Sequence, residues 1–538
     1  MPNSVKYNTE SEANALTIGN MHIGTGDIPK GPTSSTGFYN GINPPNGGYA
    51  IYIHKTTEGS SILLPTNDAE LIVMTNQIAG ASYTTINECF NYFAGQSGKF
   101  VIHNPIPPFI TSDLRFSIDS RILPSYPRNG STLYDLSGYN NNWTPLTNVV
   151  FNGQSFEFNG TTSYMQDTVS SFNPDSAPNV MEVLFKPMDL GSRQQAIFSD
   201  NWGPEYGVWI NSNNTLQGVA YTSVSTSNIQ VGRWYYAVLN VQPGATRSST
   251  DQTYLQFYVN GQFIGENNSN TGNGMNDQPF SLGFDYKSNN PAAFFSGSIA
   301  SARLSYGQYD QADVNFNYYG GNIVTDGLVT ALDFSNLVSY ESGSSSGYSL
   351  TGSVGFDLFN SPTDTSNFGG GIKCQETDEF IALDDVTATD YVTVEVWYTR
   401  DSAGSGEDIV FNKESTWEIR DDGGNINWAV KANNQGWFWY DSTANISVGE
   451  TVHFVLTYDG NYVKSYKNGD LVQTYTYPSG GVLTSQTSCY PKLNSRGCTR
   501  TSVSNPGNHT FYQFRIYDRA LTDEEVAQNY NANINRFN

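Results

Sequence analysis

Three sequence landmarks occur twice in this 538-residue chain, in the same order and at nearly the same spacing. The segment 182-EVLFKP-187 returns 213 residues later as 395-EVWYTR-400. The segment 254-YLQFYVNGQFIG-265 returns 208 residues later as 462-YVKSYKNGDLVQ-473. The segment 299-IASARLSYGQYDQADVNFNYYG-320 returns 212 residues later as 511-FYQFRIYDRALTDEEVAQNYNA-532. A period of this length is that of a whole globular domain and not of a solenoid repeat. The chain is therefore predicted to contain two copies of one domain.

Each copy consists of short strand-like runs that are separated by turn residues. Asn260-Gly261 and Asn468-Gly469 each stand between two alternating runs, a pattern that predicts a two-residue β-hairpin. Many short strands without interleaved helices predict two antiparallel sheets packed face to face. The second copy should end in a helix over residues 522–534, where Thr522 and Glu525 have the spacing of a capping box.

The predicted fold class is mainly β, with two tandem antiparallel β-sandwiches after a small α+β N-terminal module. The module is expected over residues 1–108 and includes two helices, at 69–80 and 83–96. The Pro-rich 104-NPIPPF-109 marks its end. The sandwiches are expected over residues 109–322 and 323–538.

The formal net charge of −24 argues against nucleic acid as a partner, because such a surface repels phosphate backbones. No apolar run is long enough to insert into a membrane. The N-terminal residues lack the basic and apolar regions of a secretory signal, so we expect synthesis in a cytoplasm without a cleaved signal peptide. Four cysteines are too few for a disulfide scaffold, and 489-CYPKLNSRGC-498 is compatible with a short disulfide loop or with two free thiols.

The order of motifs resembles the concanavalin A-like lectin/glucanase superfamily in its laminin-G-like form. The motifs that carry the resemblance are 133-LYDLSGYNNNW-143, 156-FEFNGTTSYMQ-166, the hairpin at Asn260-Gly261 and the C-terminal 514-FRIYDRALTDEEVAQNYN-531. The resemblance covers residues 110–535 and implies jelly-roll sandwiches. The second copy departs from it at 348-YSLTGSVGFDL-358, so the Asn-rich turn is not required for the fold.

A second resemblance concerns the N-terminal module. The string 29-PKGPTSSTGFYNGINPPNGGYAIYIHK-55, together with 83-YTTINECFNYFAGQ-96, resembles virion structural proteins of marine T4-like tailed phages. It implies a protein of the virion surface that contacts other virion proteins through this module. It also accounts for sandwich domains typical of extracellular proteins in a chain without a recognised signal peptide.

Candidate ligand-binding residues are aromatic, because sugar rings stack on aromatic faces and hydrogen-bond to nearby amides and carboxylates. In 435-QGWFWYDS-442, Trp437 and Trp439 should share one face of a strand and Phe438 and Tyr440 the other. Both faces are core only if the strand is covered twice, so one face is available for exposure to a ligand. The alternative is a core pair together with ordinary surface aromatics. The glycan-binding candidates are Trp437, Trp439, Tyr440, Trp202, Trp143 and Asn141.

The 133–143 motif has two interpretations. The structural one makes it a Tyr and Leu anchor, a tight turn and a return strand, with the Asn residues hydrogen-bonding to their own backbone. The functional one makes Asn140, Asn141, Asn142 and Trp143 part of a sugar-facing rim.

Metal and catalytic signals are weak. The resemblance allows a Ca²⁺ ion at a loop rim, with 200-DNWGPEYG-207 and 421-DDGGN-425 as examples of suitable loops, but it specifies no ligand set. The alternating acids of glucanases are missing: 376-ETDE-379 and 418-EIRDD-422 fail the spacing and are interpreted as solvated loop acids. His453 is expected to be a sheet residue.

We therefore expect a virion surface protein, such as a head decoration, head fibre or tail-associated appendage, that displays lectin-like domains and contacts cell-surface glycans weakly. Several copies, in a homo-oligomer or on one particle, would add avidity. The alternatives are a structural decoration without a ligand and a glycan hydrolase.

Overall fold

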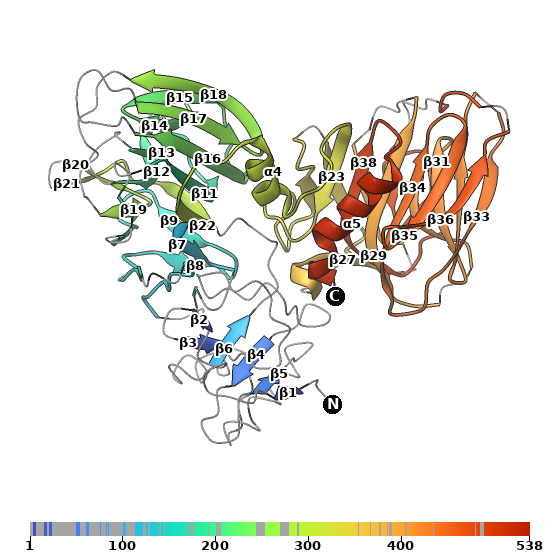
Figure 1. The fold of residues 1–538 in the computed structure, drawn as a ribbon, viewed down its shortest axis with the longest axis horizontal. Coiled ribbons are helices and arrows are strands. Elements are labelled where there is room, and N and C mark those ends of the chain that lie inside the picture. Colours follow the sequence, from blue (N-terminus) through green and yellow to red (C-terminus); the bar gives the residue numbers. More distant parts are fainter. Residues whose placement is uncertain are drawn as a thin grey trace. The chain divides into compact units, whose positions relative to one another are not determined.

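The computed structural model describes most of residues 113–537, with gaps at 122–124, 127–129, 201–205, 244–252, 270–278 and 485–488 and at scattered shorter positions. Before residue 113 it describes little more than six strands. The contacts divide the chain into two units, Met1–Tyr318 and Tyr319–Phe537, and each is described by itself. The chain is mainly β, as predicted (Figure 1).

The N-terminal region contributes a four-stranded antiparallel sheet and a separate hairpin. The sheet has the order β1 (Ser4–Lys6), β5 (Ser61–Leu63), β4 (Ala50–Ile53) and β6 (Phe100–His103), and the hairpin joins β2 (Leu16–Ile18) to β3 (Met21–Ile23). Nearly all of residues 69–96, the region of the two predicted helices, lies outside the described residues.

The first sandwich packs two antiparallel sheets face to face. One has the order β18 (Gln262–Ser269), β17 (Thr253–Val259), β16 (Tyr235–Gln242), β11 (Asn179–Pro187), β22 (Ser296–Tyr306), β9 (Phe156–Asn159) and β8 (Val150–Phe151), and β7 (Leu114–Asp119) also pairs with β22. The other has the order β10 (Met165–Asp167), β19 (Phe280–Leu282), β12 (Gln195–Ser199), β13 (Tyr206–Ile210), β14 (Thr215–Ala220) and β15 (Thr222–Asn228). A small hairpin of β20 (Asp285–Lys287) with β21 (Asn290–Ala292) and the helix α4 (Gln311–Tyr319) complete this part of the chain.

The second sandwich repeats this plan. Its back sheet has the order β26 (Thr363–Thr365), β27 (Gly371–Cys374), β38 (His509–Tyr517), β29 (Val392–Arg400), β34 (Thr451–Tyr458), β35 (Tyr462–Lys467) and β36 (Asp470–Thr476), and β23 (Leu328–Asp333) also pairs with β38. Its front sheet has the order β24 (Ser346–Tyr348), β25 (Gly355–Phe359), β28 (Phe380–Leu383), β37 (Lys492–Leu493), β30 (Asp408–Lys413), β31 (Trp417–Asp422), β32 (Asn425–Val430) and β33 (Phe438–Asn445). A 3₁₀ turn at Asn367–Gly369 and the helix α5 (Asp523–Phe537) complete it.

The core of the second sandwich lies between its two sheets. Phe411 of the front sheet and Phe514 of the back sheet approach with ring centroids 4.5 Å apart. Trp417 and Trp428 are fully buried in the same cluster. Apolar burial of this kind is the main favourable term for folding.

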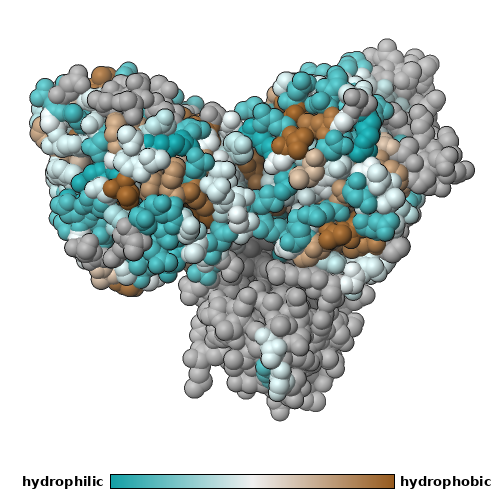
Figure 2. All heavy atoms as spheres, turned by 180° about the vertical axis from the view of Figure 1, so that it is seen from behind, coloured by the Kyte–Doolittle hydropathy of each residue, from teal (hydrophilic) through white to brown (hydrophobic). Residues whose placement is uncertain are grey.

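On the face shown in Figure 2, hydrophilic side chains predominate and hydrophobic ones form small separate patches.

Both predicted hairpins and the predicted helix start are confirmed. The Asn-Gly pairs 260–261 and 468–469 have positive φ angles and connect β17 to β18 and β35 to β36. At the start of α5, the Glu525 backbone N–H donates to Thr522 Oγ1 at 3.2 Å, and the Thr522 N–H donates to Glu525 Oε2 at 2.8 Å. Local sequence therefore determines these chain reversals and this helix terminus.

A buried ion pair lies beneath the last helix of the second sandwich. Arg515 on β38 pairs with Glu395 on the neighbouring strand β29, and both side chains are buried. Asn529 of α5 donates from Nδ2 to Glu395 Oε2 at 2.7 Å. His453 on β34 lies on the other side of Glu395, with Nε2 3.1 Å from Oε1, and is a buried sheet residue as expected. The helix and three strands therefore meet at one carboxylate.

The first sandwich has the same arrangement at equivalent positions. Glu182 on β11 lies 3.5 Å from Arg303 on β22, and Asn317 of α4 donates to the same carboxylate at 2.9 Å. Removing one partner of a buried pair leaves an uncompensated charge, which costs far more than removing both. The duplicated triad thus fixes each helix on its sheet.

We predict that the second sandwich loses stability as the pH falls from about 4.5 to about 2. Burial alone would raise the pKa of Glu395, but the Arg515 charge and the contacts with His453 and Asn529 lower it from 4.5 to about 2. Because the folded state holds this carboxyl ionised more strongly than the unfolded state, its contribution of about 3 kcal/mol is present above pH 4.5 and disappears on acidification. The loss of stability is measured by hydrogen exchange of β29 and β38 peptides in the full chain, corrected for the intrinsic exchange rate at each pH.

The matched control for this experiment is the double variant Glu395→Gln/Arg515→Met, which removes both charges. Other ionised carboxyls of the sandwich also respond to acid, so the difference between the two proteins isolates Glu395. An equal acid sensitivity of wild type and double variant would contradict the assignment.

Candidate functional site

The outer face of β33, the edge strand of the front sheet, carries two tryptophans. Trp439 is 42% exposed and Trp437, just before the strand, is half-buried, and their ring centroids lie 6.3 Å apart with planes at 32°. On the other face, Tyr440 stacks on Trp428 at 4.4 Å and packs with Phe438 against the core. The predicted division of the two faces is confirmed, and we call the pair Trp437 and Trp439 the aromatic shelf.

Neighbouring strands hold Trp439 in place. Ala429 lies directly opposite it on β32 and is fully buried. The guanidinium carbon of Arg420 on β31 lies 4.5 Å from the Trp439 ring centroid, a cation–π contact. Arg420 is itself paired with Glu407 at 3.0 Å and with Asp422 at 3.5 Å. The ring is thus supported by the sheet while much of its surface faces solvent.

Polar side chains border the shelf. Asn427 on β32 lies directly opposite Asp441 on β33, and its Nδ2 donates to Asp422 Oδ2 at 3.3 Å. Glu407 accepts a 3.5 Å hydrogen bond from Asn505. The shelf therefore combines flat aromatic surface with amides and carboxylates, the groups that bind hydroxyl-rich ligands.

These rim residues were not predicted from the sequence, and one interpretation was wrong. The acids of 418-EIRDD-422 do not lie in a loop, because they belong to β31. Glu418 and Asp421 are buried, and Asp421 pairs with Arg400 at 2.5 Å. The alternation of Glu418, Arg420 and Asp422 was the available signal, since it places all three on the outer face of a strand.

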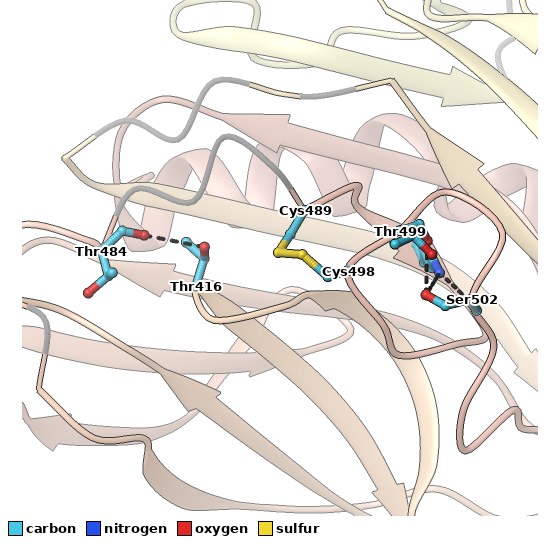
Figure 3. The surroundings of a disulfide bond; sticks show 7 residues. Thr416, Thr484, Cys489, Cys498, Thr499 and Ser502 are labelled. Atoms are coloured by element: carbon cyan, nitrogen blue, oxygen red, sulfur yellow. Dashed lines mark hydrogen bonds between the residues drawn. A yellow bond between two sulfur atoms is a disulfide. The ribbon is translucent and has the colours of Figure 1, made fainter.

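A loop clamped by a disulfide contacts β31 of the front sheet, which is separated from β33 by β32. Cys489 and Cys498 are bonded, which decides between the two alternatives left by the sequence (Figure 3). Arg496, inside the loop, donates from Nε to Glu418 Oε2 at 2.8 Å. Glu418 lies opposite Ala429, in the same row of the sheet as Trp439. The loop is thereby joined to the strands that support the shelf.

Contacts of the residues just after Cys498 also hold the loop in place. Lys492 of β37 donates to the Ser502 backbone oxygen and lies 3.1 Å from Ser502 Oγ, while Ser502 Oγ donates to the Thr499 oxygen at 2.9 Å (Figure 3). Burial lowers the pKa of Lys492 to about 8. Arg500 pairs with Asp357 at 2.7 Å and with Asp384 at 2.6 Å. These contacts of Lys492, Ser502 and Arg500 hold the loop on the front sheet.

Two of the predicted glycan-binding residues are structural, so that prediction is wrong for them. Trp143 is 0% exposed and stacks on Phe116 at 4.6 Å in the core of the first sandwich. Asn141 is 5% exposed and donates from Nδ2 to the Arg115 backbone oxygen at 2.8 Å. The buried Asp135 organises the turn by accepting backbone hydrogen bonds, including those of Ser117 and Asn141. The 133–143 motif is therefore structural, although Asn141 bonds to the Arg115 backbone on β7 and not to that of its own turn.

The remaining candidates differ in their placement. Tyr440 faces the core side of β33 and is only partly exposed, so it supports the shelf from below. Trp202 lies outside the described residues. The loop that contains Trp202 was one of the two suggested calcium-binding loops. The other, 421-DDGGN-425, forms the hairpin turn between β31 and β32. In the part of the chain that the structure describes, no three His, Cys, Asp or Glu side chains cluster as metal ligands would.

The first sandwich has no counterpart of the shelf at the equivalent strand positions. Ser223 on β15 lies opposite Val219 on β14, as Trp439 lies opposite Ala429. Trp209, at the position of Arg420, is buried with Ala196 and Val219 in a small cluster. The two copies thus share a fold and differ on this outer face.

A family model described as the concanavalin A-like lectin/glucanases superfamily matches residues 159–315 and 375–527, more than half of the chain. No curated protein matches the sequence. None of the described helices is both long and apolar enough to span a membrane.

Among solved structures, the binding domain of Paraclostridial Mosquitocidal Protein 1 is 16% identical, with a TM-score of 0.31 over 38% of this chain and 52% of that one. The botulinum neurotoxin serotype D ligand binding domain, solved in complex with N-acetylneuraminic acid, is 14% identical, with a TM-score of 0.31 over 38% of this chain and 51% of that one. This chain spans about half the length of each of these structures, and a likeness at this level carries no functional argument.

We predict that the double variant Cys489→Ser/Cys498→Ser destabilises the second sandwich by about 2–3 kcal/mol, the value expected for opening a loop of this length. Hydrogen exchange of peptides covering β30 and β37 in the full chain should increase, while peptides of the first sandwich serve as the internal reference. Unchanged exchange in β30 and β37 would show that the disulfide does not hold the loop on the sheet.

Proposed function

This chain belongs to the concanavalin A-like lectin/glucanases superfamily, and from that membership we propose that it binds glycans through the aromatic shelf of its second sandwich. The observation that carries the proposal is the solvent-facing Trp439, supported from below and bordered by carboxylates and amides. An exposed aromatic ring on a rigid sheet offers a stacking face without a large ordering cost.

The comparison between the two copies supports this assignment. The fold does not require tryptophan at this position, because the first sandwich has Ser223 there. A large exposed indole gains little for folding, whereas stacking on a sugar ring gives it a role.

We predict that Trp439→Ala weakens glycan binding about tenfold or more, through loss of one stacking face. Tyr462→Ala is the matched control, because Tyr462 is 47% exposed and lies on β35 of the back sheet, which carries no shelf residue. Binding of the full chain to a glycan array, followed by titration of the best ligand, measures both variants. Equal losses in the two variants, or binding that survives Trp439→Ala, would refute the assignment to the shelf.

We further propose that the protein works on the surface of a virion. The N-terminal resemblance, 29-PKGPTSSTGFYNGINPPNGGYAIYIHK-55, supports attachment to other virion proteins through residues 1–108. The Cys489–Cys498 disulfide supports a working place outside a reducing cytoplasm, where such bonds persist. Several copies on one particle, or in one homo-oligomer, would convert weak single contacts into strong adhesion.

Antibody labelling of purified particles of the encoding virus tests this location. An antibody raised to residues 325–538 should decorate the particles in electron micrographs, over the head for a decoration or head fibre and at the tail for an appendage. Particles without label would refute the virion proposal. Labelled particles together with a chain that binds no glycan would favour a structural decoration, and sugar release from polysaccharides would favour a hydrolase.

A further inference from the structure

Building on the proposed function, we propose that the ligand is a linear polysaccharide whose neighbouring sugars lie along β33, and not a single terminal sugar. The two indoles of the shelf follow one another along the strand, with centroids 6.3 Å apart and planes tilted by 32°. The centroid distance is close to the separation between residues i and i+2 on one face of a strand. This spacing along the strand allows consecutive sugars of one chain to stack on consecutive rings.

The exposed track continues beyond the tryptophans. Along β33 the outward residues Trp439, Asp441, Thr443 and Asn445 are all exposed, whereas Ser442 and Ala444 between them are buried. A terminal sugar needs one ring and a closed pocket, but this strand exposes a row of side chains from Trp439 to Asn445, with a bulge at Thr443. A strip of this form suits a chain that lies lengthwise.

The end of the track next to Trp437 is open. Gly436 is exposed, and a Cβ placed on it would meet no atom within 4 Å. The open space at Gly436 is compatible with a chain that continues past Trp437. Recognition of internal sugars requires such an exit, because the polymer extends in both directions.

The polar end of the track complements the aromatic end. Asp441 lies opposite Asn427, so a carboxylate and an amide stand side by side one position beyond Trp439. These groups can accept and donate hydrogen bonds to sugar hydroxyls. The track thus provides two stacking positions followed by a hydrogen-bonding position, which predicts contact with about three consecutive sugars.

The test uses the full chain and one glycan array. The array carries short glycans with different terminal sugars, together with gluco-, xylo-, manno-, galacto- and chito-oligosaccharides of increasing length. We expect binding to a linear series, with affinity rising about tenfold for each added sugar that stacks and reaching a plateau near three sugars. The Trp437→Ala variant should lose one of these steps, and Trp437→Phe should restore it because the aromatic face returns.

The possible failures are distinguishable. Binding that depends on Trp439 but is as strong for a single terminal sugar as for the longest oligosaccharide would overturn the linear-chain inference and leave the proposed function intact. A Trp437→Ala variant with unchanged length dependence would also overturn it. Absence of binding to every glycan on the array would overturn both.

Discussion

A buried ion pair between two central strands of the back sheet fixes the last helix of the second sandwich on its sheet. Glu395 and Arg515 can remain ionised in the interior only because each compensates the other and Asn529 satisfies a further oxygen. This requirement places α5 on the outer face of the back sheet, where Phe537 stacks on Trp397 at 4.1 Å. The helix covers part of that face, whereas the outer face of the front sheet carries the aromatic shelf.

The duplication allows the two copies to differ in role while they keep one fold. Both sandwiches keep the glutamate, the arginine and the helix asparagine, so both have the same scaffold. They differ on the outer face of the front sheet, where the first copy buries Trp209 and the second exposes Trp439. Side chains on that face contribute little to the core, and they can therefore change without loss of the fold.

Features determined by neighbouring residues could be predicted from the sequence. The Asn-Gly turns, the Thr522–Glu525 capping box and the separation of Trp439 from Tyr440 on opposite faces of a strand depend on local geometry. Features that depend on partners far away in the sequence could not be predicted from it. Glu418 meets Arg496, 78 residues away, and Asp421 meets Arg400, so no local pattern showed that these acids are buried. Trp143 follows an Asn-rich turn, a pattern that suggests exposure. It is nevertheless buried in the core, where it stacks on Phe116 of a different strand.

The most direct measurement is a crystal structure of the full chain with its best-binding oligosaccharide. We expect sugar rings stacked on Trp439 and Trp437, with hydroxyls hydrogen-bonded to Asp441 or Asn427. A sugar bound at a loop rim or on the first sandwich, with the shelf empty, would contradict glycan binding at the shelf.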